Sequence, residues 1–456
     1  MDGEEIQRIV RETNYVTWRR QGGWDPLVIT RAEGSRFWDS AGKEYLDFSS
    51  QLIATNLGHG NAAVAEAIAQ QARTLPYAAP SFATEARARL SAALLQVLPK
   101  GLDRFFFSTS GTEANEAALK IARAVTGRSK VVARYRSYHG STAASISVTG
   151  EFRRRASEKV QRVPGTVFAP DCYCYRCPFG LTYPNCGVAC AEYVDYQLAR
   201  EGDVAAMIIE PVVGTNGVIV PVPEYLPRLR EITKKHEALL IADEVMSGWG
   251  RVGEWFAVDH WKVRPDILTT AKGITGAQMP LGLTATTAEV HDAFRESYFP
   301  HGHTYEAHPL TLAPGVAAIE EYRRLGLLEK SRKDGEYLLT RLREIQAKHR
   351  SVGEVRGLGL FAAVELVKNR TSKEPFNTED DKMAGRPLVV EQVTAAMMKE
   401  GVFCIGWVSH LVIAPPLIVT REELDHGLEV LDRALAVADE RADSPPGGNA
   451  VRTSGP

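Results

Sequence analysis

The sequence predicts an α/β protein with a mainly parallel sheet covered by helices and a smaller α+β lobe. Short, continuously apolar runs alternate with helical ones, as in RFFFS, EANEAALKIARAV and KVVARY, and again in AAMIIEP, YLPRLREITKKH and ALLIADEV. Strands buried on both faces read as such apolar runs, and their alternation with helices is typical of parallel sheets. The chain has 456 residues, more than the roughly 100–200 of one domain, which indicates more than one lobe.

The pattern along the chain divides it into four segments. Residues 1–60 read as a helix followed by short strands, in which SRFWDSAGKEYLDFSS alternates apolar and polar residues. Residues 61–325 carry the alternating strands and helices. Residues 326–440 begin with a helix, continue as a strand, a glycine turn and a strand, and end in a helix and a last strand. Residues 441–456 are rich in Pro, Gly and Ser, which predicts a disordered tail.

Composition excludes several classes of function. The chain is 44% hydrophobic and 24% charged, which is ordinary for a globular protein and excludes a disordered or fibrous one. Its net charge of −2, without a basic block, gives no reason to expect nucleic acid or a membrane as partner. No apolar run approaches the roughly 18 residues of a membrane helix. The acidic start MDGEEIQRIV lacks an apolar signal core, so we expect a cytoplasmic protein.

Three apolar strands each end in a polar residue that a buried strand would not favour. These residues are Glu210, Asp243 and Lys272. A single one of them is more often a helix cap or a solvated loop residue. Because ligands bind at the carboxyl ends of strands in open parallel sheets, three in succession indicate convergence on one ligand.

Two further elements have the chemistry of a ligand site. A strand runs into Ser108, Ser110, Gly111 and Thr112 and then into a helix, and Ser110 with Glu113 has the spacing of a capping box. Free amides at such a helix start form a phosphate site, although an ordinary cap explains the pattern equally well. Tyr138-His139-Gly140 follows the strand KVVARY, where an aromatic ring can stack on a planar ligand. His139 alone is explained as well by a structural role.

Together these elements match the demands of a pyridine aldehyde that carries a phosphate. Such a group needs a lysine amine for a Schiff base and a carboxylate that keeps its ring nitrogen protonated. It also needs an anion site and a flat surface. Lys272, Asp243, the Gly111-Thr112 turn and Tyr138 supply these four. Burial beside a cationic ring would lower the pKa of Lys272, which suits Schiff-base chemistry.

A competing motif, Gly248 to Gly253, has the form G-x-G-x-x-G after the strand ALLIADEV. A dinucleotide fold then requires a helix and, about 20 residues on, an acidic residue at a strand end. The following residues, GEWFAVDHWKVRPD, contain Pro265 and have weak helical periodicity. We therefore reject nicotinamide binding as the interpretation of this motif.

From about Trp24 to Leu435 the chain resembles the class III aminotransferases, which are pyridoxal-phosphate enzymes of fold type I. The resemblance depends on short motifs in a fixed order: Ser110 to Asn115, Tyr138 to Gly140, Glu210 to Val212, Asp243 to Val245, Gly248 to Arg251, Ala271 to Gly273, His303 to Tyr305, and Ala414 to Leu417. It implies a seven-stranded sheet in the large domain and a small domain that contains both chain ends. It also implies a homodimer, and in some cases a tetramer, with the active site at the subunit interface.

The resemblance assigns roles to the residues that match the family pattern. Lys272 would form the Schiff base with pyridoxal 5'-phosphate and move the proton. Asp243 would pair with the pyridine nitrogen, and Glu210 would orient the Asp243 region or the substrate. Tyr138 would stack on one face of the ring and Val245 on the other.

Further cofactor contacts follow from the same pattern. Gly111 and Thr112 would hold the phosphate, next to Ser110. Thr304 would reach the phosphate from the other subunit. His139 is expected among the cofactor-binding residues, and Arg251 is expected to be structural near the site.

Within the family, Glu210 to Tyr225 resembles the stretch in enzymes that transfer amino groups from ω-amino acids or amines to pyruvate. The alternatives are a glutamate/2-oxoglutarate enzyme of the 4-aminobutyrate or ornithine type, and an aminomutase. Many relatives place an Arg just before the Ala-Pro-Pro motif to bind the substrate carboxylate, but residues 401–420 contain none. This absence favours apolar amines and counts against glutamate and 2-oxoglutarate, unless another Arg takes the role. By position, the residues expected around the substrate are Ile53, Tyr77, Phe82, Tyr138 and Trp407.

Five of the six cysteines lie in one short segment, at Cys172, Cys174, Cys177, Cys186 and Cys190. The spacing suits a four-thiolate metal site, but the two pairs are closer together than in common zinc ribbons. Local disulfides and reduced thiols in a packed loop are the other possibilities. Since the family needs no metal for catalysis, we expect none.

Overall fold

The computed structural model describes residues 1–160 and 162–443. Its central feature is a sheet that has seven strands within these residues. In spatial order they are β4 (Arg104–Ser108), β10 (Gly282–Thr286), β9 (Ile267–Thr270), β8 (Leu239–Asp243), β7 (Val204–Ile209), β5 (Lys130–Arg134) and β6 (Thr166–Ala169). The five strands from β9 to β6 are parallel, and β10 is antiparallel to both of its neighbours. The expected mainly parallel, seven-stranded α/β fold is confirmed.

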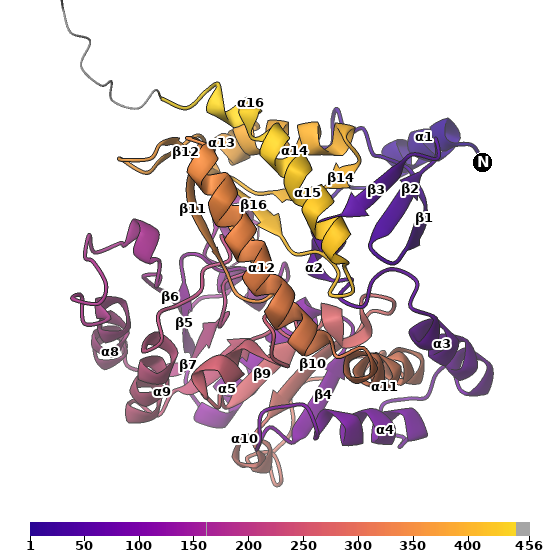
Figure 1. Cartoon of the computed structure of the whole chain (residues 1–456). Coiled ribbons are helices and arrows are strands. Elements are labelled where there is room, and N and C mark those ends of the chain that lie inside the picture. The colour runs from indigo at the N-terminus through magenta and orange to yellow at the C-terminus, as the bar shows by residue number, and fades with distance from the viewer. Residues whose placement is uncertain (161, 444–456) are drawn as a thin grey trace, which may run out of the picture.

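Helices cover both faces of this sheet, and further helices lie beyond the edge formed by β4 (Figure 1). Every residue of β7 is buried, which is why its sequence VAAMII is continuously apolar. The helices of this region are α3 (Ala62–Thr74), α4 (Glu85–Leu94), α5 (Gly111–Thr126), α6 (Ala143–Ser147), α7 (Phe152–Ser157), α8 (Ala189–Glu201), α9 (Tyr225–Lys235), α10 (Ala288–Asp292) and α11 (Pro309–Arg324). Short 3₁₀ turns lie at η1 (Cys174–Arg176), η2 (Ala257–Trp261) and η3 (Lys272–Thr275).

The two ends of the chain meet in a second region, where indigo strands lie beside orange and yellow elements in Figure 1. One sheet joins β1 (Ile29–Glu33), β2 (Arg36–Asp39) and β3 (Glu44–Asp47) to β14 (Val402–Phe403). The other contains β11 (Val352–Gly357), β12 (Ala362–Asn369), β13 (Glu374–Pro375), β15 (Ile405–Gly406) and β16 (His410–Ile413). The helices here are α1 (Gly3–Thr13), α2 (Ser50–Ile53), α12 (Leu327–Lys348), α13 (Glu379–Ala384), α14 (Val389–Lys399), α15 (Arg421–Ala434) and α16 (Ala436–Asp439).

Backbone pairing joins the N-terminal segment to the C-terminal lobe. Strand β14 runs parallel to β3, and Phe48, just after β3, bonds to Phe403 through its N–H and to Ala414 through its carbonyl. Most of the expected disordered tail, residues 444–456, lies outside the described residues. Among the helices that the structure describes, none is both long and apolar enough to cross a membrane.

A glycine contact provides a test of this join. Gly427 on α15 packs against the ring of the fully buried Phe48, and an added Cβ would lie 2.5 Å from that ring. In an open helix Gly→Ala is stabilising by about 1 kcal/mol. Here overpacking reverses the sign, and we expect Gly427→Ala to reduce the free energy of unfolding by about 1–3 kcal/mol in urea titrations. Glu429→Ala, at an exposed position of the same helix, is the control, and a stabilised Gly427→Ala would contradict the packing.

Candidate active site

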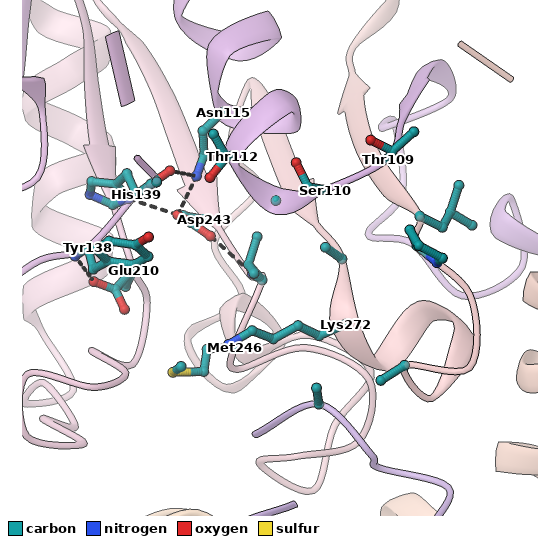
Figure 2. A pocket seen from close by; sticks show the side chains of 18 of the residues that line it. Thr109, Ser110, Thr112, Asn115, Tyr138, His139, Glu210, Asp243, Met246 and Lys272 are labelled. Carbon is teal, nitrogen blue, oxygen red and sulfur yellow. Dashed lines mark hydrogen bonds and ion pairs between the residues drawn. The ribbon is translucent and has the colours of Figure 1, made fainter. Parts of the chain in front are cut away.

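Three adjacent parallel strands deliver the three polar residues to one cavity. Asp243 is the last residue of β8, Glu210 follows β7 directly, and Lys272 lies two residues beyond β9. The cavity has a volume of about 370 Å³, and all three residues line it (Figure 2). The carboxyl ends of β7, β8 and β9 therefore form the site, as expected for an open parallel sheet.

The Asp243 carboxylate is held by three hydrogen bonds. Its Oδ2 lies 2.7 Å from His139 Nδ1 and accepts a bond of 2.7 Å from Asn115 Nδ2. Its Oδ1 accepts a bond of 3.0 Å from the Val245 N–H. Asn115 is itself oriented, because its Oδ1 accepts from Thr269 Oγ1 at 2.6 Å. The carboxylate is thus buried but fixed in one orientation, with its hydrogen-bonding needs met.

Lys272 presents a buried amine with altered acidity. Burial lowers the pKa of Lys272 from its ordinary value of 10.5 to about 8, against the opposing influence of Asp243 and Glu210. Its backbone has a φ of 51°, a left-handed conformation that costs a β-carbon residue about 1 kcal/mol or more. Gly273 packs so closely on Trp249 that a Cβ would lie 2.6 Å from it, and Tyr322 Oη donates to the Gly273 carbonyl. These contacts hold the strained segment in place.

The start of α5 forms one end of the cavity. Ser110 caps the helix by accepting from the Glu113 N–H at 3.2 Å. The expected capping box is modified, because the Glu113 carboxylate accepts from the Thr109 N–H rather than from that of Ser110. A Cβ at Gly111 would lie 2.8 Å from Val245, so only glycine leaves room there. The result is a helix N-terminus at the cavity wall, an arrangement that suits an anion.

The Glu210 carboxylate binds backbone N–H groups of two loops and makes no contact that orients Asp243. Its Oε1 accepts from the Tyr138 N–H at 3.0 Å, and its Oε2 accepts from the Gly214 N–H at 2.7 Å. Burial raises the pKa of Glu210 above its ordinary value. The carboxylate joins the loop that carries Tyr138 to the loop after β7. The structure shows no hydrogen bond between Glu210 and Asp243.

These features fit pyridoxal phosphate. The cavity offers an amide-lined end for a phosphate at Gly111 and Thr112, and a fixed carboxylate at Asp243. It also offers an aromatic ring at Tyr138 and a buried amine at Lys272, as Figure 2 shows. The cradle at Gly111, which a Cβ would fill, is further evidence of fit. His139 lines the cavity too, but its bond to Asp243 gives it a supporting position.

The residues expected around the substrate are distributed differently. Tyr138 lines the cavity, whereas Ile53 is buried in the core and its neighbour Ala54 lines the cavity instead. Tyr77 and Phe82 are exposed, at 43% and 64%. Trp407 packs beside the Arg153 guanidinium. The single chain therefore brings one of the five to the cavity wall.

Thr304 is also exposed in the single chain and does not line the cavity. Its carbonyl accepts a bond of 3.3 Å from Tyr77 Oη. The rings of Tyr77 and Tyr305, both exposed, lie within 6 Å of the His308 ring. These three residues and Thr304 form one aromatic group on the surface of the single chain.

Several residues that shape the site have no role predicted from the sequence. Asn115 is buried on the otherwise apolar face of α5, and a polar residue at such a position is the signal that could have identified it. Thr215 and Met246 line the cavity from loops that carry no such signal. Arg153 lies in FRRRAS, which has the pattern of an exposed basic turn, so the sequence does not distinguish it from its neighbours.

Arg251 is structural, as its position in the motif implied. Its Nη1 donates to the carbonyls of Leu360 and Pro415, and its Nη2 donates to Ser50 Oγ and Asn56 Oδ1. Burial lowers the pKa of this guanidinium to about 10. One buried cation thus joins the N-terminal segment, the loop after β8 and the C-terminal lobe.

The five clustered cysteines line a second, small cavity beside η1 and the start of α8. All of them are free thiols. Among the described residues, no group of three or more His, Cys, Asp or Glu side chains is arranged to hold a metal ion.

Comparison with known proteins places these observations in context. Residues 19–435 match the family model described as aminotransferase class-III. A leucine/methionine racemase of Thermococcus litoralis is 35% identical, with 96% of this chain and 95% of that protein covered. A taurine–pyruvate aminotransferase of Bilophila wadsworthia is 34% identical, with 97% and 99% covered. A taurine:2-oxoglutarate aminotransferase from Bifidobacterium kashiwanohense, solved with PLP and glutamate, superposes with a TM-score of 0.91 at 36% identity, with 97% and 99% covered.

The buried amine predicts a pH-dependent stability in the cofactor-free protein. Below pH 8 both folded and unfolded states are protonated at Lys272, and the folded state bears the full cost of burying the charge. Between pH 8 and 10.5 the unfolded state binds more protons, so this contribution to stability rises with pH. We expect Lys272→Met to be more stable than the cofactor-free parent at pH 7, with a difference that shrinks by pH 9.5.

Urea titrations at both pH values measure the difference. The exposed Lys399→Met is the control, and its stability should stay within about 0.5 kcal/mol of the parent. A Lys272→Met protein that is less stable than the parent at pH 7 would contradict the cost of burial.

Proposed function

Because the chain belongs to the class III aminotransferase family, we propose that it moves an amino group from an ω-amino acid or another primary amine to a keto acid, with pyruvate as the main acceptor. The enzymes of this class use pyridoxal phosphate, and this chain is an aminotransferase of that class. The observation that carries the proposal is the convergence of Lys272, Asp243 and the start of α5 on one buried cavity.

The cofactor contacts are proposed from the side chains that line the cavity. Gly111 and Thr112, with Ser110, would hold the phosphate at the helix start. Tyr138 and Val245 would face the two sides of the ring, and Asp243 would pair with its nitrogen. When bound, pyridoxal phosphate supplies an aldehyde that condenses with amines and a ring that accepts an electron pair.

The chain supplies the proton chemistry. With a pKa of about 8, Lys272 is partly neutral near pH 7, and its Nζ can accept a proton from the donor carbon and return it. Asp243 is held by three donors before the reaction begins, so it needs no reorganisation as charge develops. Asp243 is buried and Lys272 is half-buried at the cavity wall, so their interaction is stronger than it would be in bulk water.

The choice of acceptor is proposed from the branch that the sequence resembles. The Bilophila wadsworthia relative is named for pyruvate. This supports the interpretation that the stretch from Glu210 to Tyr225 is typical of enzymes that use pyruvate as acceptor. The Bifidobacterium kashiwanohense enzyme is named for 2-oxoglutarate, so both acceptors belong in the test.

A homodimer, and possible pairing into tetramers, is proposed from the family and from the exposed aromatic group. In this group Tyr77 is 43% exposed, and Tyr305, next to Thr304 in the chain, is 58% exposed. In this proposal Thr304 of one subunit completes the phosphate site of the other. The cytoplasmic location expected from the sequence stays a prediction.

The test is the visible absorption spectrum of the purified protein with pyridoxal phosphate, before and after adding β-alanine, taurine or 1-phenylethylamine separately. We expect a coloured protein that one or more donors bleach and pyruvate restores. If only 2-oxoglutarate reverses the bleaching, the acceptor is 2-oxoglutarate and not pyruvate. Turnover without any keto acid would indicate a racemase or aminomutase, and a protein that binds no pyridoxal phosphate would contradict the proposal.

Lys272→Ala is expected to lose essentially all turnover, because among the described residues Lys272 is the one lysine that lines the cavity and can move the proton. The variant should still bind the phosphate end of the cofactor, since the start of α5 is unchanged. Tyr138→Phe is the mild comparison, because an aromatic ring remains. Steady-state turnover and cofactor retention measure both, and full activity of Lys272→Ala would contradict the assignment.

Asn115→Leu removes a 2.7 Å bond to the Asp243 carboxylate. A hydrogen bond to a charged group is worth about 1.5–3 kcal/mol, so we expect kcat to fall about 10- to 100-fold. Thr269→Val is the matched control, because it removes the Thr269 bond to Asn115 but leaves the bond to Asp243. Equal losses in both variants would contradict a specific role for Asn115.

A further inference from the structure

Arg153 lies against the wall of the cavity, beside residues that a substrate would meet. It belongs to α7, the second helix after the Tyr138 loop, and is only 5% exposed. Its guanidinium carbon lies 3.7 Å from the centre of the Tyr138 ring and 4.6 Å from that of Trp407. The cation is therefore buried among aromatic rings, one of which lines the cavity.

The hydrogen bonds of Arg153 leave part of its donor set unused. Nε donates to Glu151, and Nη2 donates to Thr215 Oγ1 at 3.3 Å. Within the part of the chain that the structure describes, Nη1 donates to no acceptor. Thr215, like Tyr138, lines the cavity. The guanidinium thus contacts two residues of the cavity wall and retains a free donor edge.

The surroundings of Arg153 do not neutralise it completely. Burial raises the pKa of Glu151 to about 7, even though Arg153 opposes the shift, so near neutral pH Glu151 carries only part of a charge. The Nε1 donor of Trp407 is buried, and it has no partner among the described residues. The cluster therefore combines a guanidinium that Glu151 neutralises only in part with an unpaired indole donor, which is the chemistry of an anion site.

We propose that Arg153 is a specificity-determining residue that binds the carboxylate or sulfonate of an anionic amine donor, a proposal that rests on the proposed function. The planar guanidinium suits the paired oxygens of either acid, and exclusion of water strengthens the contact. This reverses the expectation from residues 401–420, whose lack of Arg favoured apolar amines.

The alternative is that Arg153 is only the structural partner of Glu151. The two interpretations differ in what Arg153→Gln does to different donors. If Arg153 binds the acid group, only anionic donors lose affinity. If it only supports α7 and the Tyr138 loop, neutral and anionic donors suffer alike.

The experiment measures the donor half-reaction alone, because pyruvate carries its own carboxylate. Protein loaded with pyridoxal phosphate is mixed with β-alanine, taurine or the neutral n-butylamine, and bleaching is followed against donor concentration. For Arg153→Gln we expect the half-saturating concentration to rise about 10- to 100-fold for β-alanine, taurine or both, with little change for n-butylamine. The relative size of the two rises shows whether the site prefers carboxylate or sulfonate.

Glu151→Gln is the matched control, since it removes the neighbouring carboxylate and keeps the guanidinium. Its affinity for anionic donors should be equal or higher. Calorimetric titration with propionate, ethanesulfonate and the neutral propionamide provides a readout without turnover. Binding of the two anions should weaken in Arg153→Gln, and that of propionamide should not. If Arg153→Gln does not fold, Arg153→Lys retains the charge without the planar fork and should show a smaller loss for the anions alone.

Equal losses for neutral and anionic donors, or no loss for the anions, would overturn the role of Arg153. Bleaching of the parent protein by n-butylamine but by neither anion would also overturn it, while leaving the aminotransferase proposal intact. No bleaching of the parent protein by any amine would instead contradict the proposed function itself.

Discussion

The hydrogen bonding of the Asp243 carboxylate is the constraint on which the rest of the site depends. A buried charge is tolerated only where its acceptors are satisfied. Here the donors come from α5 through Asn115, from the loop after β5 through His139, and from the backbone after β8. Satisfying one carboxylate therefore fixes the relative positions of three elements. The same three elements contribute the proposed phosphate end of the cavity and its aromatic wall.

The site concentrates features that an ordinary core avoids. Lys272 combines a left-handed backbone with a buried amine, and Arg251 is a fully buried cation. Each is held by contacts from distant parts of the chain, such as those of Ser50, Leu360 and Pro415 with Arg251. Strain and buried charge persist where the surroundings over-determine them, which is characteristic of functional sites. Asn56, which accepts from Arg251, also donates to the Trp249 carbonyl, and Trp249 packs on Gly273, so contacts from the meeting of the chain ends reach the residue beside Lys272.

In the proposed site, the loop that carries Tyr138 connects the cofactor ring to the residue that selects the donor. Glu210 fixes its backbone through the Tyr138 N–H, and Arg153 stacks on its ring from α7. Thr215 accepts a hydrogen bond from Arg153 and lines the cavity. A change in this loop would therefore affect the aromatic wall and the proposed anion site together, and donor specificity cannot be altered there independently of ring stacking.

The sequence by itself determined the sheet and the positions of Glu210, Asp243 and Lys272, because apolar strand runs and their polar ends are local patterns. It also located the start of α5, since capping chemistry is encoded within a few residues. Only the tertiary structure decided the partners: that Asn115 and His139 hold Asp243, and that Ile53 turns into the core. Arg153 shows the reason most clearly. Its burial and free donor edge arise from Tyr138, Thr215 and Trp407, which are far apart in sequence, and no local pattern records such contacts.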